Sequence, residues 1–379
     1  MTSRERVQTT LRFQEPDKVP LAVYAIDCDT AARILGRPTF LRDKAGTQIA
    51  FWEGRRDEVV ESLKRDIPEL YAKLEIVDLI YLSKIARVPP RGYHPPAPTP
   101  VGEGVWEDEQ GRIFRYSAVT NEIAQVTGKT NWQHEYRLEQ FPLDPEVTPE
   151  DESVWEVYDH VLPLLPPDKY ILGSWALAPQ QIMLGGWERG LVEVATHPEV
   201  VERAVQSHIA RARKLQQITP LRPCDGIMGE SDFGHTTGTF VSPAAFRRLF
   251  LPALKANSEA VHGAGKDFFL HSCGDNRPIF DQLVEAGIDC LQSLQPQAGM
   301  SPALVKERSG NHVAAWGGVD VANLVAGSMD DVRRDVRTAM ETAKRGGGFL
   351  LGSSHSIAWG TKYDNFMAML DEFEKTRDY

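Results

Sequence analysis

Residues 267–295, DFFLHSCGDNRPIFDQLVEAGIDCLQSLQ, give the clearest indication of the fold. This stretch opens with an apolar run that fits a buried strand, passes through a polar loop into a helical segment at 278–287, and ends in a second apolar run. A strand, a helix and a second strand in this order indicate that the two strands lie parallel in one sheet.

The same alternation continues on both sides of this stretch. The sequence predicts strands near 170–178, 225–234, 312–320 and 348–357, and helices near 189–218, 242–263 and 330–343. Ser242 is suited to cap the helix at 242–263, with Pro243 at its first position. This number of repeats favours a closed barrel over an open doubly wound sheet, and no glycine-rich phosphate fingerprint follows an early strand.

We therefore expect an α/β fold, a (β/α)8 TIM barrel that forms a single domain over residues 1–379. One excursion is expected in the N-terminal half. The proline-rich run at 88–100 leads into VWEDEQGRIFRY (105–116), where two β-prone runs flank a Gln-Gly turn and predict an inserted hairpin.

Composition narrows the class of partner. The net charge is −11 and no cluster of Lys and Arg stands out, which argues against a nucleic-acid partner. No apolar run resembles a signal peptide or a membrane span. The 4 cysteines are irregularly spaced and do not suggest a disulfide framework, so we expect a cytoplasmic protein.

Polar side chains gather where the predicted strands end. In TIM barrels the carboxyl ends of the strands carry the chemistry, so these residues are the candidates for a site. They are Glu230, Asp232, His271, Cys273, Gln295, Asp320 and His355.

His271-Ser272-Cys273-Gly274 is the sharpest of these features. Residues two apart at a strand end point the same way, so the imidazole and the thiol can converge on one ion. Nitrogen and sulfur donors suit zinc, and Gly274 lets the chain turn sharply beside them. The alternative is a buried cysteine that packs as a small hydrophobe next to a hydrogen-bonded histidine.

Further zinc ligands must come from other strand ends, and His355 and Glu230 are the candidates. Cys28, Cys224 and Cys290 are interpreted as structural. Asp232 and His235 stand three residues apart, which is not the spacing of the D-x-H-x-x-G motif that seats the lower ligand of a corrinoid. We therefore expect no corrinoid bound to this chain itself.

Several segments, taken in order, resemble the uroporphyrinogen decarboxylase superfamily. They are SRERVQTTLRFQEPDKVPL (3–21), GSWALAP (173–179), GESDFGHTTGTFVSPAAFRRLFLPALK (229–255), FLHSCGD (269–275), LQPQAGM (294–300), WGGVD (316–320) and GSSHSI (352–357). True decarboxylases of that family carry an arginine-rich loop after the first strand. The matching region here, VYAIDCDTAARILGR (23–37), has acids where that loop has bases.

The H-x-C-G segment resembles instead the zinc-dependent, corrinoid-linked methyltransferases of the superfamily. Those enzymes hold zinc through the His and Cys of this segment and through a late cysteine. The resemblance therefore implies that His271 and Cys273 bind zinc in this chain. In the place of the late cysteine this sequence has His355, and the decarboxylases also have a histidine there.

The resemblance implies an enzyme that moves a methyl group from a small methoxylated or methylated compound to a separate corrinoid protein. Zinc (Zn2+) would be held by His271 and Cys273 with Glu230 and His355, and His355 and Asp232 would be catalytic. Tyr24, Trp175, Gln295 and Asp320 would line the substrate pocket, and a homodimer is expected.

Two other functions stay open at this point. One is a metal-free decarboxylase of a small acid, which would use His355 with Asp232 or Asp27. The other is a barrel that binds a small molecule or a corrinoid protein without catalysis.

Overall fold

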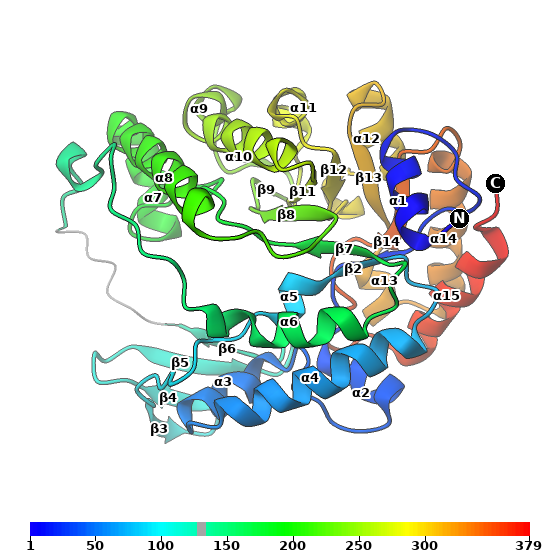
Figure 1. The fold of residues 1–379 in the computed structure, drawn as a ribbon, viewed down its shortest axis with the longest axis horizontal. Helices are drawn as coiled ribbons and strands as arrows, with labels where there is room; N and C mark the ends of the chain where they lie inside the picture. Colours follow the sequence, from blue (N-terminus) through cyan, green and yellow to red (C-terminus); the bar gives the residue numbers. More distant parts are fainter. Residues whose placement is uncertain (127–133) are drawn as a thin grey trace.

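The computed structural model describes residues 1–126 and 134–379, and its centre is a ring of parallel strands (Figure 1). In these residues the ring has the order β1-β2-β7-β8-β11-β12-β13-β14. Its strands are β1 (Ala22–Val23), β2 (Leu79–Tyr81), β7 (Tyr170–Gly173), β8 (Gly226–Glu230), β11 (Asp267–His271), β12 (Cys290–Gln292), β13 (Ala314–Val319) and β14 (Phe349–Ser353).

The first and last strands close the ring. Leu21 and Leu351 form a parallel bridge, as do Ile26 and Ile357, and Leu351 N donates to Pro20 O at 3.0 Å. Strands in sequence order, all parallel and closed on themselves, make the (β/α)8 barrel that the sequence predicted.

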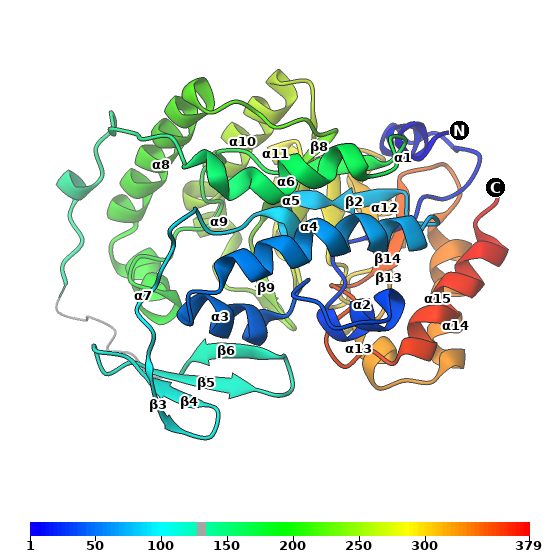
Figure 2. The same cartoon turned by 60° about the horizontal axis from the view of Figure 1, so that its bottom comes forward.

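Helices surround the strands (Figures 1 and 2). They are α1 (Ser3–Leu11), α2 (Cys28–Leu35), α3 (Lys44–Trp52), α4 (Arg56–Lys73), α5 (Leu82–Ala86), α6 (Glu156–Val161), α7 (Trp187–Thr196), α8 (Pro198–Ile218), α9 (Pro243–Leu249), α10 (Leu251–Gly263), α11 (Phe280–Ala286), α12 (Pro302–Ser309), α13 (Val321–Val325), α14 (Met329–Ala343) and α15 (Tyr363–Thr376). Within the described ranges, none of them combines the length and apolarity that crossing a bilayer requires.

Two predicted helices are each divided in two. The stretch at 189–218 breaks at His197, before Pro198, and the stretch at 242–263 breaks at Phe250, before Pro252. Proline lacks the N–H that would continue the preceding helix, so one new helix begins at Pro198 and another at Leu251, directly before Pro252. The predicted cap is confirmed, because Ser242 Oγ accepts from Ala245 N at 3.2 Å.

The N-terminal excursion is larger than the predicted hairpin. It is an antiparallel sheet of β3 (Thr99–Gly102), β4 (Val105–Glu107), β5 (Ile113–Ser117) and β6 (Glu122–Gln125), and the predicted hairpin is its β4–β5 pair. The sheet lies outside the barrel beside α3 (Figure 2). There the ring of Trp52 lies 5.5 Å from Trp106 and 6.0 Å from Phe114.

The barrel interior is filled by large side chains. Trp316 on β13 is fully buried, and its indole Nε1 donates to Ala22 O on β1 at 3.0 Å. A Cβ on Gly352 would lie 2.5 Å from that nitrogen, so β14 needs a glycine there. Cys28, Cys224 and Cys290 are free and buried, which agrees with their structural interpretation.

Candidate metal centre

Strand register brings the candidate residues together at the carboxyl end of the barrel. His271, at the end of β11, lies opposite Glu230 on β8 and Gln292 on β12. Gly274 turns the chain immediately after Cys273 with a φ of 82°. A Cβ at Gly274 would lie 2.2 Å from the carbonyl carbon of Gly234, so only glycine allows the two segments to approach this closely.

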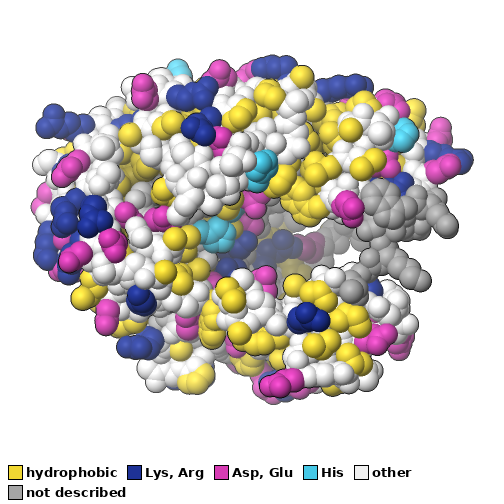
Figure 3. All heavy atoms as spheres, turned by 180° about the vertical axis from the view of Figure 1, so that it is seen from behind, with side chains coloured by type: hydrophobic (Ala, Val, Ile, Leu, Met, Phe, Trp, Pro, Cys, Tyr) yellow, Lys and Arg dark blue, Asp and Glu magenta, His cyan; other side chains and the backbone are white. Residues whose placement is uncertain are grey.

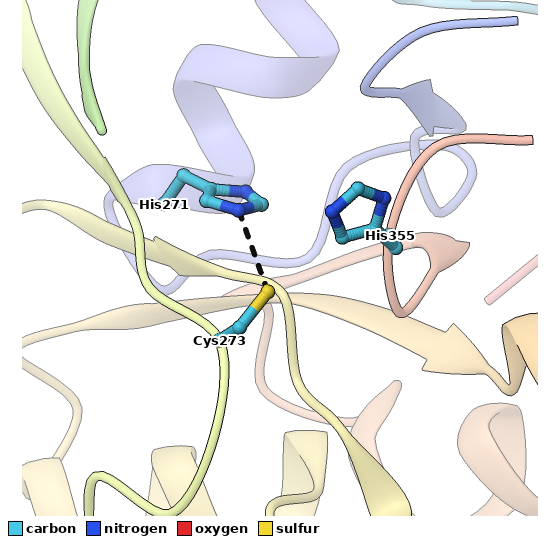
Figure 4. A group of neighbouring side chains, drawn as sticks. All are labelled: His271, Cys273 and His355. Atoms are coloured by element: carbon cyan, nitrogen blue, oxygen red, sulfur yellow. Dashed lines mark hydrogen bonds between the residues drawn. The ribbon is translucent and has the colours of Figure 1, made fainter. Parts of the chain in front are cut away.

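His271, Cys273 and His355 form a convergent set of donors (Figure 4). Each contributes one ligand atom, and the three atoms lie within 4.8 Å of one another. His271 Nε2 is 3.5 Å from Cys273 Sγ. Two imidazoles and one thiol match the ligand types of zinc and leave a fourth position for substrate or water, so the set fits this metal.

Hydrogen bonds orient both imidazoles. His271 Nδ1 contacts Gln292 Oε1, and His355 Nδ1 lies 3.1 Å from Ser356 Oγ. With each Nδ1 occupied, each Nε2 remains available to a metal. The ring of Tyr24 stacks on His271 with centroids 4.6 Å apart and an interplanar angle of 25°.

Burial sets the protonation of the three donors. It lowers the pKa of His355 to about 4, with neighbouring His271 adding to the effect, and it lowers the pKa of His271. Burial raises the pKa of the Cys273 thiol to about 12. At neutral pH both imidazoles are therefore neutral and able to ligate, whereas the thiol keeps its proton until a cation displaces it.

Glu230 lies beside this set but outside it. Lys84 Nζ donates to both carboxylate oxygens, at 2.9 and 2.8 Å, and the Tyr24 hydroxyl donates to Oε1. Although burial opposes it, Lys84 holds the pKa of Glu230 below its usual value. The ionised Glu230 thus anchors Tyr24, which in turn packs on His271.

Asp232 adjoins the same set from the loop after β8. Its Oδ1 accepts from Cys273 N at 2.8 Å and lies 3.7 Å from His271 Nε2. The side chain is 47% exposed, so it faces solvent as well as the site.

A cavity of about 390 Å³ opens onto two of the donors, His271 and His355. Its lining residues are Tyr24, Arg42, Lys84, Gln181, Trp187, Glu230, Ser231, Asp232, His271 and His355. A second cavity of about 660 Å³ shares Lys84 and Glu230 with the first and is lined by Trp175. Figure 3 shows the molecule hollowed on one side, with histidine and Lys or Arg side chains visible in the hollow.

Gln295 and Asp320, the other two residues expected in the pocket, have different surroundings. Asp320 caps α13 by accepting from Ala322 N at 2.9 Å, and it also accepts from Gln297 Nε2. Gln295 precedes a short 3-10 helix, Pro296–Ala298. Neither residue lines the two cavities described above.

The sequence patterns did not predict several residues of the site. Gln292 could have been found from the pairing of β11 with β12, which puts it opposite His271. Ser293, whose Oγ lies 2.8 Å from Cys273 Sγ, follows it directly. Arg42, Lys84, Gln181 and Trp187 come from stretches without a motif and meet the site only through the fold.

Comparison with known proteins agrees with this architecture. Residues 227–376 match the family model of uroporphyrinogen decarboxylase (URO-D). No curated protein matches the chain by sequence. A solved methyltransferase from Methanosarcina mazei shares the fold with a TM-score of 0.59 and 17% identity, covering 99% of each chain.

A putative vitamin-B12-independent methionine synthase from Listeria monocytogenes is a more distant structural match, with a TM-score of 0.42 and 11% identity over 94% of this chain and 98% of that one. The family match includes the strand ends that carry Glu230, His271 and His355, and the fold extends the likeness over the whole chain. The match to the uroporphyrinogen decarboxylase family thus covers residues 227–376, and over the rest of the chain the likeness to the solved methyltransferase is one of fold.

Proposed function

We propose that this protein is a zinc-dependent methyltransferase. The methyl group would come from a small methoxylated or methylated compound and pass to a corrinoid carried by a separate protein. The convergence of His271, Cys273 and His355 carries the proposal, with His271 and His355 lining a cavity at the carboxyl end of the barrel. The resemblance of the H-x-C-G segment to corrinoid-linked methyltransferases supports it.

The donor set determines the kind of chemistry. His271, Cys273 and His355 would hold the metal, with Glu230 retained by Lys84 rather than by the ion. When bound, zinc supplies Lewis acidity toward the substrate atom that carries the methyl group. A set with a single thiolate brings less negative charge than one with two, which favours a methyl group linked to oxygen or nitrogen.

The other residues of the cavity have separate tasks. Tyr24 packs on His271 and, with Lys84 and Glu230, forms one wall of the cavity. Once the methyl group has left, the substrate oxygen or nitrogen needs a proton. Asp232 reaches both the site and solvent, so it is suited to relay that proton.

Metal analysis and methyl transfer test the proposal together. Protein purified without chelator should contain about one zinc per chain, and it should methylate cob(I)alamin when a methoxylated compound is supplied. His271→Ala should lose both properties, because it removes a donor. Less than a tenth of an equivalent of zinc, before and after zinc supplementation, would contradict the methyltransferase proposal.

One observation favours a second function, decarboxylation of a small acid. Arg42 and Lys84 line the same cavity as His355, and a small substrate carboxylate could bind to these cations if it displaced Asp27 or Glu230, with which they are paired. Asp27 is less suited to act as a base, since it is 1% exposed and accepts from Arg42 Nε at 3.0 Å and from Trp359 N at 3.1 Å. Release of carbon dioxide in the presence of a chelator would identify this function.

A further inference from the structure

Two consecutive residues at the end of β12 are held in unfavourable states. Gln292 is fully buried, yet its Nε2 has no hydrogen-bond partner among residues 1–126 and 134–379. Ser293 has a φ of 78°, a left-handed conformation that non-glycine residues rarely adopt. A buried unpaired amide and a strained backbone each cost stability, and such costs concentrate at functional sites.

The amide oxygen of Gln292 forms a hydrogen bond with His271. Parallel pairing of β11 with β12 sets the two residues side by side, and Gln292 Oε1 accepts from His271 Nδ1. Because Nδ1 then carries the ring proton, the lone pair lies on Nε2. That is the nitrogen 3.5 Å from Cys273 Sγ.

Ser293 contacts the other donor of the same strand end. Its Oγ lies 2.8 Å from Cys273 Sγ and donates to Ser354 O at 2.9 Å. Ser354 directly precedes His355, so one hydroxyl connects Cys273 to the loop that carries the third donor. Ser293 is 1% exposed, and its contacts are therefore made without competition from bulk water.

We propose that Gln292 and Ser293 are positioning residues that together hold His271 and Cys273 as metal donors. This inference rests on the metal centre of the proposed function. Outer hydrogen bonds of this kind fix the ring orientation and tautomer of a ligating histidine and tune the metal. A neutral amide in place of a carboxylate adds no negative charge to the centre, so it leaves the Lewis acidity of a bound cation high.

Cobalt(II) binding tests the proposal, because cobalt replaces zinc and reports the thiolate by its charge-transfer band. Gln292→Leu keeps the volume and removes the acceptor, so cobalt should bind about 10–100-fold more weakly. Gln292→Glu restores an acceptor and should bind at least as tightly as the parent. Once a cation displaces the thiol proton, the Ser293 hydroxyl can turn from Ser354 O to the sulfur, so Ser293→Ala should shift the thiolate band to lower energy.

Two matched variants control for damage to the fold. Gln282 is another buried glutamine, on α11, where its Nε2 donates to Pro243 O at 2.9 Å. Ser309 is another buried serine, bonded to Lys306 O and Val313 O. Gln282→Leu and Ser309→Ala should leave cobalt affinity and spectrum unchanged. If Gln292→Leu matches these controls while the parent binds cobalt, Gln292 has no positioning role.

A metal-free measurement separates this inference from the proposed function. In chelated protein, the nitrogen-15 shifts of His271 should show the Nδ1–H tautomer, and Gln292→Leu should abolish that preference. Loss of the preference supports the positioning role of Gln292 even if methyl transfer is never observed. A His271 tautomer that is the same in the parent and in Gln292→Leu would overturn that role even in an active methyltransferase.

Discussion

His355 is the donor that comes from farthest along the sequence, and it distinguishes the two halves of the superfamily. If it ligates the metal, His355→Ala should lose zinc, whereas His355→Cys should keep it. Cysteine also reaches zinc, with a bond only about 0.2–0.3 Å longer. The Cys variant should react more slowly with an oxygen-linked methyl donor, because a second thiolate makes the metal a poorer Lewis acid.

Zinc content by elemental analysis and the initial rate with one methoxylated compound are the two readouts for this pair. His160 provides a control, since it lies on α6 and outside the residues that line the site cavity. His160→Ala should retain zinc and rate. Zinc binding by His355→Ala as tight as in the parent would reassign His355 to proton transfer or substrate contact.

The residues of the site differed in how far the sequence revealed them. His271 and Cys273 are two positions apart, so strand geometry alone predicted that they converge. His355 was a candidate because it follows the last predicted strand, and the resemblance added that a late ligand occupies this place. Gln292 and Ser293 look like ordinary polar residues in LQSLQ, and their role depends on parallel pairing with β11, which a linear pattern does not contain.

At the level of elements, the two ends of the barrel are put to different uses. At the amino ends of β2, β8 and β12 stand Asp78, Asp225 and Asp289. Each accepts a hydrogen bond from a backbone N–H at or next to a neighbouring strand. Asp78 accepts from Leu21 N at 2.9 Å, Asp225 from Ile171 N at 2.8 Å, and Asp289 from Phe268 N at 2.6 Å. These carboxylates fasten the barrel at one end, while the carboxyl ends carry the metal donors.

Asp66 makes a comparable connection between helices. From α4 it accepts from Thr39 Oγ1 at 2.7 Å and Ser62 Oγ at 2.8 Å, and it pairs with Arg37 and Arg65. Although burial opposes it, these donors hold the pKa of Asp66 at about 2, below its usual 3.8. A shift of that size corresponds to about 2 kcal/mol of folding stability at neutral pH.

Asp66→Asn should therefore destabilise the protein by about 2 kcal/mol at pH 7, measured by urea unfolding. The sign follows from the lowered folded-state pKa. The stabilisation is complete above the unfolded pKa near 4, and it disappears as pH falls through about 2, so the parent and variant should converge across that window. Asp57→Asn, whose side chain is 92% exposed, should change stability by less than about 1 kcal/mol. An Asp66→Asn effect no larger than this control would contradict the assignment.

In the whole molecule, the sequence predicted the regular second half well, but of the N-terminal excursion it predicted only the β4–β5 hairpin. From residue 170 onward, strands alternate with helices as predicted, because apolar runs and amphipathic runs differ in period. In the first half, α3 and the β3–β6 sheet support each other through Trp52, Trp106 and Phe114. Partly buried aromatic pairs of this kind arise from tertiary packing, which leaves little periodic signal in the sequence.

The region after β1 bears on whether the protein can bind uroporphyrinogen, the substrate of true decarboxylases. Two acids follow β1, and both fasten the loop after β14: Asp27 Oδ2 accepts from Trp359 N at 3.1 Å and Asp29 Oδ2 from Gly360 N at 2.7 Å. Decarboxylases resemble one another in placing arginines in the region where these acids stand.

We therefore expect no decarboxylation of uroporphyrinogen under anaerobic conditions, assayed by chromatography of the oxidised porphyrins. The substrate carries many carboxylates, and Glu230 and Asp232, which line the cavity, would repel them, while Arg42 is already paired with Asp27. An authentic decarboxylase in the same assay controls for substrate quality. Stepwise appearance of porphyrins with fewer carboxylates would show that the protein is a decarboxylase, because methyl transfer removes no carboxylate from the substrate.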